Sequence, residues 1–206
     1  MIKSLYPTFQ RWSDGGSVWV ISDTHFGDDN CKLISPDWPA PEEHIANINR
    51  AMKGGCSCLI HLGDVGDAEY VKQIKARHKV LITGNHDVGA ERYKSYFDEI
   101  YTGPLMVSDK LILSHEPLDV LPWAFNLHGH IHSKTCPREY NIYGGWVGMN
   151  VAADVVDYMP VNLGELITKE GMLSDIEHIH HMTVRRAVED DRRQANRILE
   201  LLQCDD

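Results

Sequence analysis

The sequence predicts an α/β protein in which a mostly parallel β-sheet packs against a second sheet. Short apolar runs alternate with helix-like stretches up to about residue 100. This alternation predicts right-handed crossovers between parallel strands. After Tyr101 the pattern changes to short strand-like runs separated by Gly, Pro and Asp, which predicts the second sheet.

Three apolar runs in the first part have the length of central strands. They cover residues 18–21, 58–60 and 80–82, and each leads into polar residues or glycine. Because these runs are apolar at every position, we expect a sheet that is covered on both faces.

Two helix-like stretches lie between these strands. The first opens at Pro41 and stops at Gly54, with apolar residues at helical spacing between them. The second covers residues 68–77, with Val71 and Ile74 on one face. The alternation of strand, helix and strand predicts a mostly parallel sheet in this part of the chain.

The second part of the chain contains short predicted strands and one short helix. The strands cover residues 105–107, 111–114, 125–127 and 146–151. Asn162 and Glu165 form a capping pair for the helix, which we expect to stop near Gly171.

The length of 206 residues predicts one domain with a core of its own. We place this domain at residues 1–171 and a charged helical tail at residues 172–206, which packs on the domain or forms a homodimer. The first residues lack the apolar stretch of a secretory signal, and no segment has the length of a membrane span. An odd number of irregularly spaced cysteines indicates reduced thiols and a cytoplasmic location: Cys31, Cys56, Cys58, Cys136 and Cys204.

The charge balance limits the partners of the protein. The 20 Lys and Arg against 30 Asp and Glu give a formal net charge of -10, and no basic stripe offsets it. We therefore expect the protein to bind neither long duplex nucleic acid nor membrane surfaces. A small phosphate ester remains compatible with this charge balance.

Five of the 12 histidines lie just past predicted strands, together with Asp and Asn. Loops at the carboxyl ends of parallel strands converge, so these side chains can surround one small volume. Imidazole, carboxylate and amide donors without thiolate suit Mn, Fe, Zn, Ni or Co better than Ca or Mg. The candidate donors exceed the three protein ligands of a single catalytic zinc and predict a two-metal site: Asp23, His25, Asp64, Asn85, His115, His130 and His132.

These motifs, in this order, resemble the signature of the calcineurin-like metallophosphoesterase superfamily over residues 18–151. The runs 22–27, 126–132, 150–151 and 160–163 are similar to those of small bacterial and phage phosphoesterases. The resemblance implies a four-layer α/β/β/α sandwich of two mixed sheets flanked by helices. It also implies two ligand sets that share Asp64, namely Asp23, His25, Asp64 and His132 for one metal and Asp64, Asn85, His115 and His130 for the other.

Two further roles follow from the resemblance. His86 would face the substrate phosphate and stabilise developing charge or protonate the leaving oxygen. Asp67 would orient His86, although an ordinary acidic residue at a helix N-terminus accounts for it equally well. Many relatives have Arg after this Asp, whereas this chain has Ala68, so a phosphate-binding Arg would have to come from elsewhere.

The resulting functional hypothesis is a metal-dependent phosphatase or phosphodiesterase in which a hydroxide bridging two divalent metals attacks the ester. Mn is the metal that we expect to serve best in vitro. The alternatives are a nuclease or cyclic-nucleotide phosphodiesterase of the same superfamily and, ranked last because every expected donor is present, a non-catalytic interaction scaffold.

Other notable side chains have ordinary explanations. Core or solvated positions are expected for the remaining histidines, with a supporting role left open for His61 and His128 beside the motifs. The rest of this group is His44, His78, His178, His180 and His181. Base stacking by a tryptophan is weighed against a place in the core or at the rim for Trp12, Trp38, Trp123 and Trp146.

Overall fold

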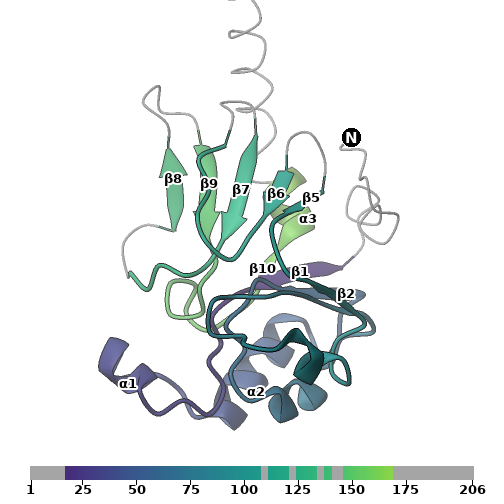
Figure 1. Ribbon diagram of the computed structural model, residues 1–206, viewed down its shortest axis with the longest axis vertical. Coiled ribbons are helices and arrows are strands. Elements are labelled where there is room, and N and C mark those ends of the chain that lie inside the picture. The colour runs from purple at the N-terminus through teal and green to yellow at the C-terminus, as the bar shows by residue number, and fades with distance from the viewer. Residues whose placement is uncertain (1–16, 108–110, 121–123, 134–136, 141–145, 169–206) are drawn as a thin grey trace, which may run out of the picture.

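The computed structural model describes residues 17–107, 111–120, 124–133, 137–140 and 146–168. In these ranges the chain forms two five-stranded mixed sheets that pack face to face, with helices on the outer face of the first sheet (Figure 1). This confirms the predicted α/β class. The expected charged C-terminal helix and the 172–206 tail lie outside the described residues, so the tail and the homodimer stay predictions.

The first sheet is parallel except at one edge. Val18 of β1 pairs with Cys58 of β2, and Leu59 of β2 pairs with Lys79 of β3, both in parallel register. The edge strand β10 runs antiparallel to β1. In spatial order the strands are β10 (Val161–Asn162), β1 (Val18–Ile21), β2 (Cys58–His61), β3 (Lys79–Ile82) and β4 (Glu99–Tyr101).

The second sheet has a parallel centre and two antiparallel edges. Its central strand β7 pairs in parallel with β6 and β9, while β5 and β8 run antiparallel at the outside. In spatial order the strands are β5 (Leu105–Met106), β6 (Leu111–Leu113), β7 (Phe125–His128), β9 (Trp146–Asn150) and β8 (Arg138–Tyr140). All the strands predicted from apolar runs are confirmed.

The helices are α1 (Cys31–Ile34), α2 (Pro41–Ala51), η2 (Ala68–Gln73), η3 (Ala90–Tyr93) and α3 (Leu163–Thr168). The prediction of α2 is confirmed, with proline in its first turn. At the start of α3 the backbone N–H of Glu165 donates to Asn162 Oδ1 at 3.0 Å, as the capping pair predicted. The predicted end of this helix near Gly171 lies outside the described residues.

The predicted helix at 68–77 is instead a 3₁₀ helix that ends at Gln73. The chain that follows Gln73 pairs with Cys56, just before the start of β2. The N–H of Cys56 donates to the carbonyl of Lys75 at 3.1 Å, and the N–H of Arg77 donates to the carbonyl of Cys56 at 3.1 Å. This strand-like pairing removes residues 75–77 from a helix, which sequence periodicity does not reveal.

The first sheet is buried on both faces, as predicted. Val18 and Val20 of β1 lie in the apolar cluster between the two sheets, which also contains Phe125 of β7. Ile21 faces the second cluster, in which α2 and the 3₁₀ helices cover the sheet. The site described below is therefore carried by strands held from two sides.

Three cysteines in the described part of the chain are free and buried. Burial raises the pKa of the Cys31 thiol to about 12 and that of Cys56 to about 11. Thiols of this kind are structural rather than reactive. The same effect raises the pKa of Cys58 to about 12.

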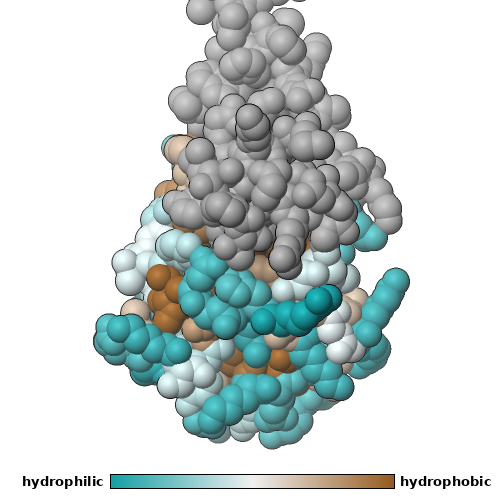
Figure 2. Space-filling view, turned by 90° about the vertical axis from the view of Figure 1, so that its right-hand side faces the viewer, coloured by the Kyte–Doolittle hydropathy of each residue, from teal (hydrophilic) through white to brown (hydrophobic). Residues whose placement is uncertain are grey.

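Hydrophilic side chains cover most of the described surface on the face seen in Figure 2, with small hydrophobic areas between them. In the described residues, no helix combines the length and the apolar character needed to cross a membrane.

Phe125→Ala tests the cluster between the sheets. The Phe125 side chain is fully buried, so its removal should lower the free energy of unfolding by about 3–5 kcal/mol. Leu33→Ala is the control, because Leu33 is 86% exposed and should change stability by less than about 0.5 kcal/mol. Urea unfolding measures both; equal effects would show that the assigned core is wrong.

Acid should destabilise the protein through two buried histidines. Burial lowers the pKa of His44 to about 3 and that of His61 to about 4. In the unfolded chain both titrate near about 6.5, so below that pH the unfolded state binds more protons than the folded state. The free energy of unfolding should therefore fall by up to about 1.4 kcal/mol per pH unit per histidine as the pH drops from about 6.5 toward these folded-state pKa values.

Urea unfolding near neutral pH and near pH 5 measures this loss. His44→Phe should make the loss smaller, because one of the two titrating groups is gone. An unchanged pH dependence in His44→Phe would contradict the assignment of a neutral, buried His44.

Candidate metal centre

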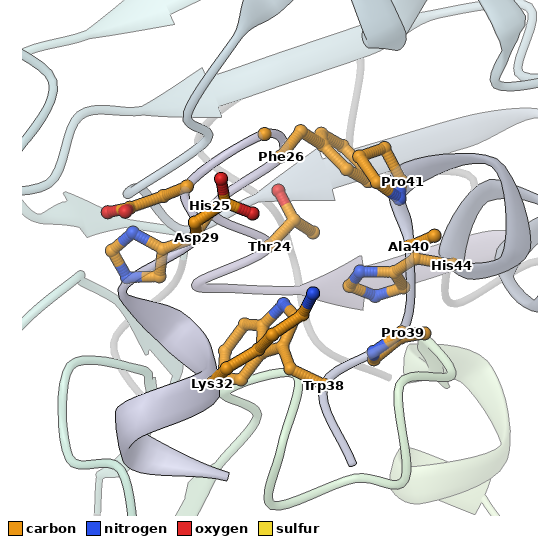
Figure 3. Close-up of a pocket in the computed structure, with 12 residues that line it drawn as sticks. Thr24, His25, Phe26, Asp29, Lys32, Trp38, Pro39, Ala40, Pro41 and His44 are labelled. Atoms are coloured by element: carbon orange, nitrogen blue, oxygen red, sulfur yellow. The ribbon is translucent and has the colours of Figure 1, made fainter. Parts of the chain in front are cut away.

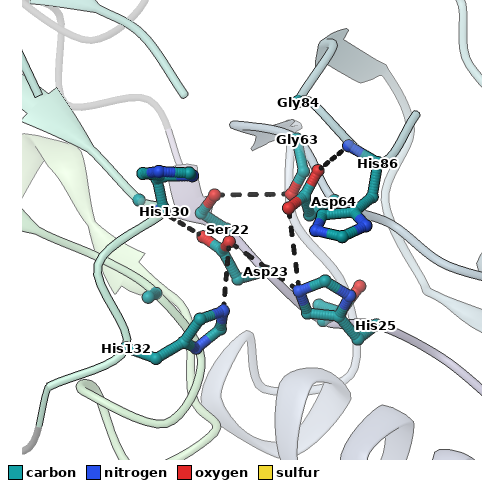
Figure 4. A network of polar contacts seen from close by, with 12 residues as sticks. Ser22, Asp23, His25, Gly63, Asp64, Gly84, His86, His130 and His132 are labelled. Carbon is teal, nitrogen blue, oxygen red and sulfur yellow. Dashed lines mark hydrogen bonds and ion pairs between the residues drawn. The ribbon is translucent and has the colours of Figure 1, made fainter. Parts of the chain in front are cut away.

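The predicted donors come together where the carboxyl ends of strands from both sheets meet. Figure 4 shows Asp23, His25, Asp64, His130 and His132 facing one another across a small space. The donors follow different strands, with Asp23 and His25 after β1, Asp64 after β2, Asn85 after β3, His115 after β6, and His130 and His132 after β7.

One group of donors surrounds Asp23. Its Oδ1 lies 4.0 Å from His25 Nε2 and 3.6 Å from His132 Nε2. Asp23 is fully buried and His25 is 8% exposed. Donor atoms at such separations can share one ion, and Asp23, His25 and His132 form a group suited to a metal.

A second group lies around His115. His115 Nε2 is 2.8 Å from Asn85 Oδ1 and 3.2 Å from His130 Nδ1. Asn85 Oδ1 also lies 3.1 Å from His130 Nδ1. These three side chains therefore aim at one point, as the ligand set implied by the resemblance requires.

Asp64 lies between the two groups. Its Oδ2 is 3.7 Å from His25 Nε2 and 3.4 Å from His115 Nε2. Burial acts to raise the pKa of Asp64, but the His115 side chain, the backbone N–H of His86 and the nearby imidazoles outweigh it and lower the pKa to about 2. Asp64 is therefore an ionised carboxylate that faces both groups.

Two donor atoms of the first group have no hydrogen-bond partner among the described residues. They are Asp23 Oδ1 and His25 Nε2, and both are buried. Burial raises the pKa of Asp23 and lowers that of His25, so burial outweighs the neighbouring groups that favour each charged form. Unpaired buried polar atoms are costly, and a divalent cation would satisfy both. The residues thus fit a metal ion.

Contacts at the Nδ1 atoms of two histidines orient their Nε2 atoms toward the site. His115 Nδ1 donates to the carbonyl of Leu62 at 2.9 Å, so in the neutral ring Nε2 carries the lone pair that faces the other donors. His132 Nδ1 lies 2.8 Å from Asp154 Oδ1, and its Nε2 faces Asp23. Such partners fix the orientation of metal-binding histidines. Sequence reasoning missed Asp154, whose only signal was a carboxylate shortly after the last central strand.

Asp87 also has a role that sequence reasoning did not assign. Its buried carboxylate accepts the backbone N–H groups of Asp64 at 2.7 Å, Val65 at 3.0 Å and Gly84 at 2.9 Å. Tyr93 Oη donates to the same carboxylate at 2.7 Å. Asp87 therefore holds the loops after β2 and β3 together and places Asp64.

His86 and Asp67 are both exposed at this edge. The backbone N–H of His86 donates to Asp64 Oδ1 at 2.9 Å, and its ring centroid lies 5.5 Å from that of His25. Asp67 caps η2, because its Oδ1 accepts the N–H of Glu69 at 3.0 Å. This contact is the one expected of an ordinary acidic residue at a helix N-terminus. An orienting role of Asp67 toward His86 stays a prediction.

Two histidines beside the motifs have structural partners. His61 Nε2 lies 2.9 Å from Thr24 Oγ1, and His61 Nδ1 accepts the N–H of Gly63 at 3.2 Å. His61 thereby joins the loop after β1 to the loop after β2. His128 Nε2 lies 2.9 Å from Glu139 Oε1. The histidines at 178, 180 and 181 lie outside the described residues.

The backbone at the donors is left-handed. The φ angles are 56° at Asp23, 41° at His25, 56° at Asp64 and 66° at His130. Such conformations are uncommon outside glycine and gather at functional sites.

Gly84 lies close against the Asp64 carboxylate, because a Cβ at Gly84 would lie 2.1 Å from Asp64 Oδ1.

Fold and site together define an α/β protein with imidazole, carboxylate and amide donors clustered at the carboxyl ends of its strands. The chain belongs to the calcineurin-like phosphoesterase family, which it matches over residues 16–203. Membership of this family makes it a hydrolase of phosphoester bonds.

Solved structures of other proteins are similar to this chain. One is the protein of unknown function AQ665 from Aquifex aeolicus, with a TM-score of 0.56, 24% identity and coverage of 73% of this chain and 97% of that one. This likeness supports the fold. Another is the Pseudomonas putida nuclease MPE, with a TM-score of 0.43, 24% identity and coverage of 58% and 62%. No match was found among curated proteins.

Gly84→Ala tests the close packing around Asp64. The added Cβ would displace the Asp64 carboxylate and should lower the free energy of unfolding by about 1–3 kcal/mol. Gly103→Ala is the matched control, because a Cβ there meets nothing within 4 Å. Thermal or urea unfolding compares the two variants. If Gly84→Ala is as stable as Gly103→Ala, the approach of Asp64 to Gly84 is wrong.

Proposed function

We propose that the protein is a two-metal phosphoesterase that hydrolyses a small phosphomonoester or phosphodiester. The observation that carries this proposal is the position of Asp64. Its Oδ2 faces His25 Nε2 at 3.7 Å on one side and His115 Nε2 at 3.4 Å on the other. One carboxylate between two donor groups is the arrangement that a pair of ions with a shared ligand needs.

The proposed ligand sets follow the two groups of donors. The first ion would be held by Asp23, His25, Asp64 and His132, and the second by Asp64, Asn85, His115 and His130. This donor set suits Mn, Fe, Ni, Zn or Co, and Mn is the metal to supply in assays. Two such ions would supply Lewis acidity and a water that is acidic enough to ionise near neutral pH.

The protein's own residues prepare this chemistry before substrate arrives. The hydrogen bond from His115 to Leu62 and the contact of His132 with Asp154 hold each imidazole in one orientation. Less reorganisation is then needed when charge develops at the phosphate.

His86 is the proposed group that acts on the leaving oxygen. It is exposed at the mouth of the site, and its backbone is fixed to Asp64 by the 2.9 Å hydrogen bond. A protonated imidazole in this place would stabilise charge on the phosphate or give a proton to the leaving alcohol.

Asp64→Ala and His130→Ala test the proposal. With Mn supplied, each should reduce hydrolysis of an aryl phosphate by more than about 100-fold, because metal ions contribute several kcal/mol to such reactions. His78→Ala is the control, since His78 contacts Asp98 and Glu99 rather than the donor groups. Wild-type turnover in both site variants would overturn the assigned centre.

Two added measurements separate the alternatives. Elemental analysis after reconstitution should give close to two equivalents of metal, whereas well under one equivalent would favour a non-catalytic scaffold. Aryl monoester and diester substrates compared at fixed Mn distinguish a phosphatase from a phosphodiesterase, and a steep salt dependence would favour a nuclease.

A further inference from the structure

A pocket beside the metal centre and a second pocket at the opposite end of the first sheet differ in charge. The pocket in Figure 3 has a volume of about 150 Å³, and its lining combines Lys32 with Asp28 and Asp29. The second pocket measures about 560 Å³, which is within the usual range for a small-molecule site. We call it the basic pocket; its described lining is Ser17, Lys53, Gly54, Gly55, Cys56, Ser57, Lys75, Ala76 and Arg77.

The basic pocket lies where strands β1 and β2 begin, whereas the metal donors lie where these strands end. Ser17 directly precedes β1, and Ser57 directly precedes β2. Asp23 follows β1, so extended chain of roughly 20 Å separates Ser17 from that donor. A phosphate held at the metal centre therefore does not reach the basic pocket, and a ligand there would occupy a site of its own.

Three positive charges line the basic pocket, and none of the described residues in its lining is acidic. The charges belong to Lys53, Lys75 and Arg77, whose side chains are exposed. In the described part of the chain the lysines that form ion pairs are Lys72 and Lys94, and neither belongs to this lining. Because the whole chain has a formal net charge of -10, such a concentration of positive charge favours binding of an anion.

Two carboxylates near the same end of the sheet have other partners. Asp98 lies 3.7 Å from His78 Nδ1, and Glu99 lies 2.7 Å from His78 Nε2. Asp98 also accepts the backbone N–H of Lys79 at 2.7 Å. Neither carboxylate belongs to the lining of the basic pocket, so the charge of that lining stays positive.

The backbone presents Lys75 and Arg77 on the same side of the chain. Ala76, which lies between them, forms a parallel bridge with Cys56. Side chains two residues apart in an extended chain point the same way, so Lys75 and Arg77 face the pocket together. The N–H of Lys75 donates to Asn49 Oδ1 at 2.8 Å, which fixes this segment to the end of α2.

Lys53 and Ser17 come from other segments of the chain. A cation at Lys53 is favourable in any case, because it follows the C-terminus of α2, so Lys53 alone does not indicate a ligand. The Ser17 hydroxyl accepts the Nε1–H of Trp19 at 2.8 Å, which leaves its own hydrogen to donate. Charges and a hydroxyl donor from three segments therefore surround one volume.

We propose that the basic pocket binds a small molecule that carries two anionic oxyacid groups, such as two phosphate groups. One group would lie between Lys75 and Arg77, and the other beside Lys53 and Ser17. Charge-assisted hydrogen bonds of this kind are about twice as strong as neutral ones. The volume of about 560 Å³ exceeds what a single tetrahedral oxyanion fills. This site does not depend on the proposed phosphoesterase activity, because its residues lie apart from the metal donors.

Calorimetry on the full chain with Mn present, at low ionic strength, tests the proposal. The probes are ethane-1,2-disulfonate, which carries two anionic groups, and ethanesulfonate, which carries one. Neither contains a phosphoester, and sulfonates are weak ligands of divalent metals, so the metal centre should not retain them. The wild type should bind the disulfonate with a dissociation constant below roughly 10 mM, and at least about threefold more tightly than the monosulfonate.

The double variant Lys75→Gln/Arg77→Gln should weaken binding of the disulfonate by about tenfold or more. The matched control is Lys72→Gln/Lys94→Gln, which removes the same number of charges from exposed positions outside the pocket. The control should change binding by less than about twofold. Equal losses in the two double variants would show a general effect of net charge and would overturn the site.

Two other results would also contradict the proposal. One is the absence of disulfonate binding to the wild type. The other is a loss of binding in Asp64→Ala that leaves Lys75→Gln/Arg77→Gln unaffected, because the probe would then occupy the metal centre. A crystal structure with the disulfonate gives the final check. A probe between Lys75 and Arg77 supports the proposal, and a probe bound elsewhere overturns it.

Discussion

The position of the Asp64 carboxylate is the constraint on which the rest of the site depends. Its Oδ1 is held by the backbone N–H of His86, and its own N–H is held by Asp87. Asp64 Oδ2 therefore faces His25 on one side and His115 on the other. If this carboxylate moved, it would no longer face both donor groups. Asp87 holds the loops that carry it, and the lack of a side chain at Gly84 leaves room for it.

The strain at the site is offset by the packing of the sheets that carry it. Left-handed backbone at non-glycine residues such as Asp23, Asp64 and His130 costs of order 1–3 kcal/mol each. The strands that end there are covered by apolar clusters on both faces of the first sheet. The buried hydrogen bonds of His61 with Thr24 and Gly63 fix the first two loops relative to each other. Burial elsewhere therefore maintains a local geometry that the loops would not adopt alone.

How much of the structure could be predicted from the sequence depended on the kind of signal each element leaves. Central strands such as β1 were predictable because burial on both faces leaves an unbroken apolar run. The strands that escaped prediction, β4, β8 and β10, all lie at sheet edges, where one row of hydrogen bonds and few apolar residues are enough. The donor residues were predictable because their motifs follow central strands. Asp154 and Asp87 were not assigned, because their partners lie far away in sequence or are backbone groups, and neither leaves a side-chain pattern.

The bridge between Ser22 and Ala152 is where the backbones of the two sheets meet. The N–H of Ser22 donates to the carbonyl of Val151 at 3.0 Å, and the N–H of Ala153 donates to the carbonyl of Ser22 at 2.9 Å. These hydrogen bonds lie directly beside the proposed metal ligands. Donors from the first sheet and from the second would thus share the same ions. Under the proposed assignment each ion is a cross-link between sheets as well as a catalyst. Metal loading would then raise the free energy of unfolding of both sheets together, because each ion binds only where the two sheets are docked.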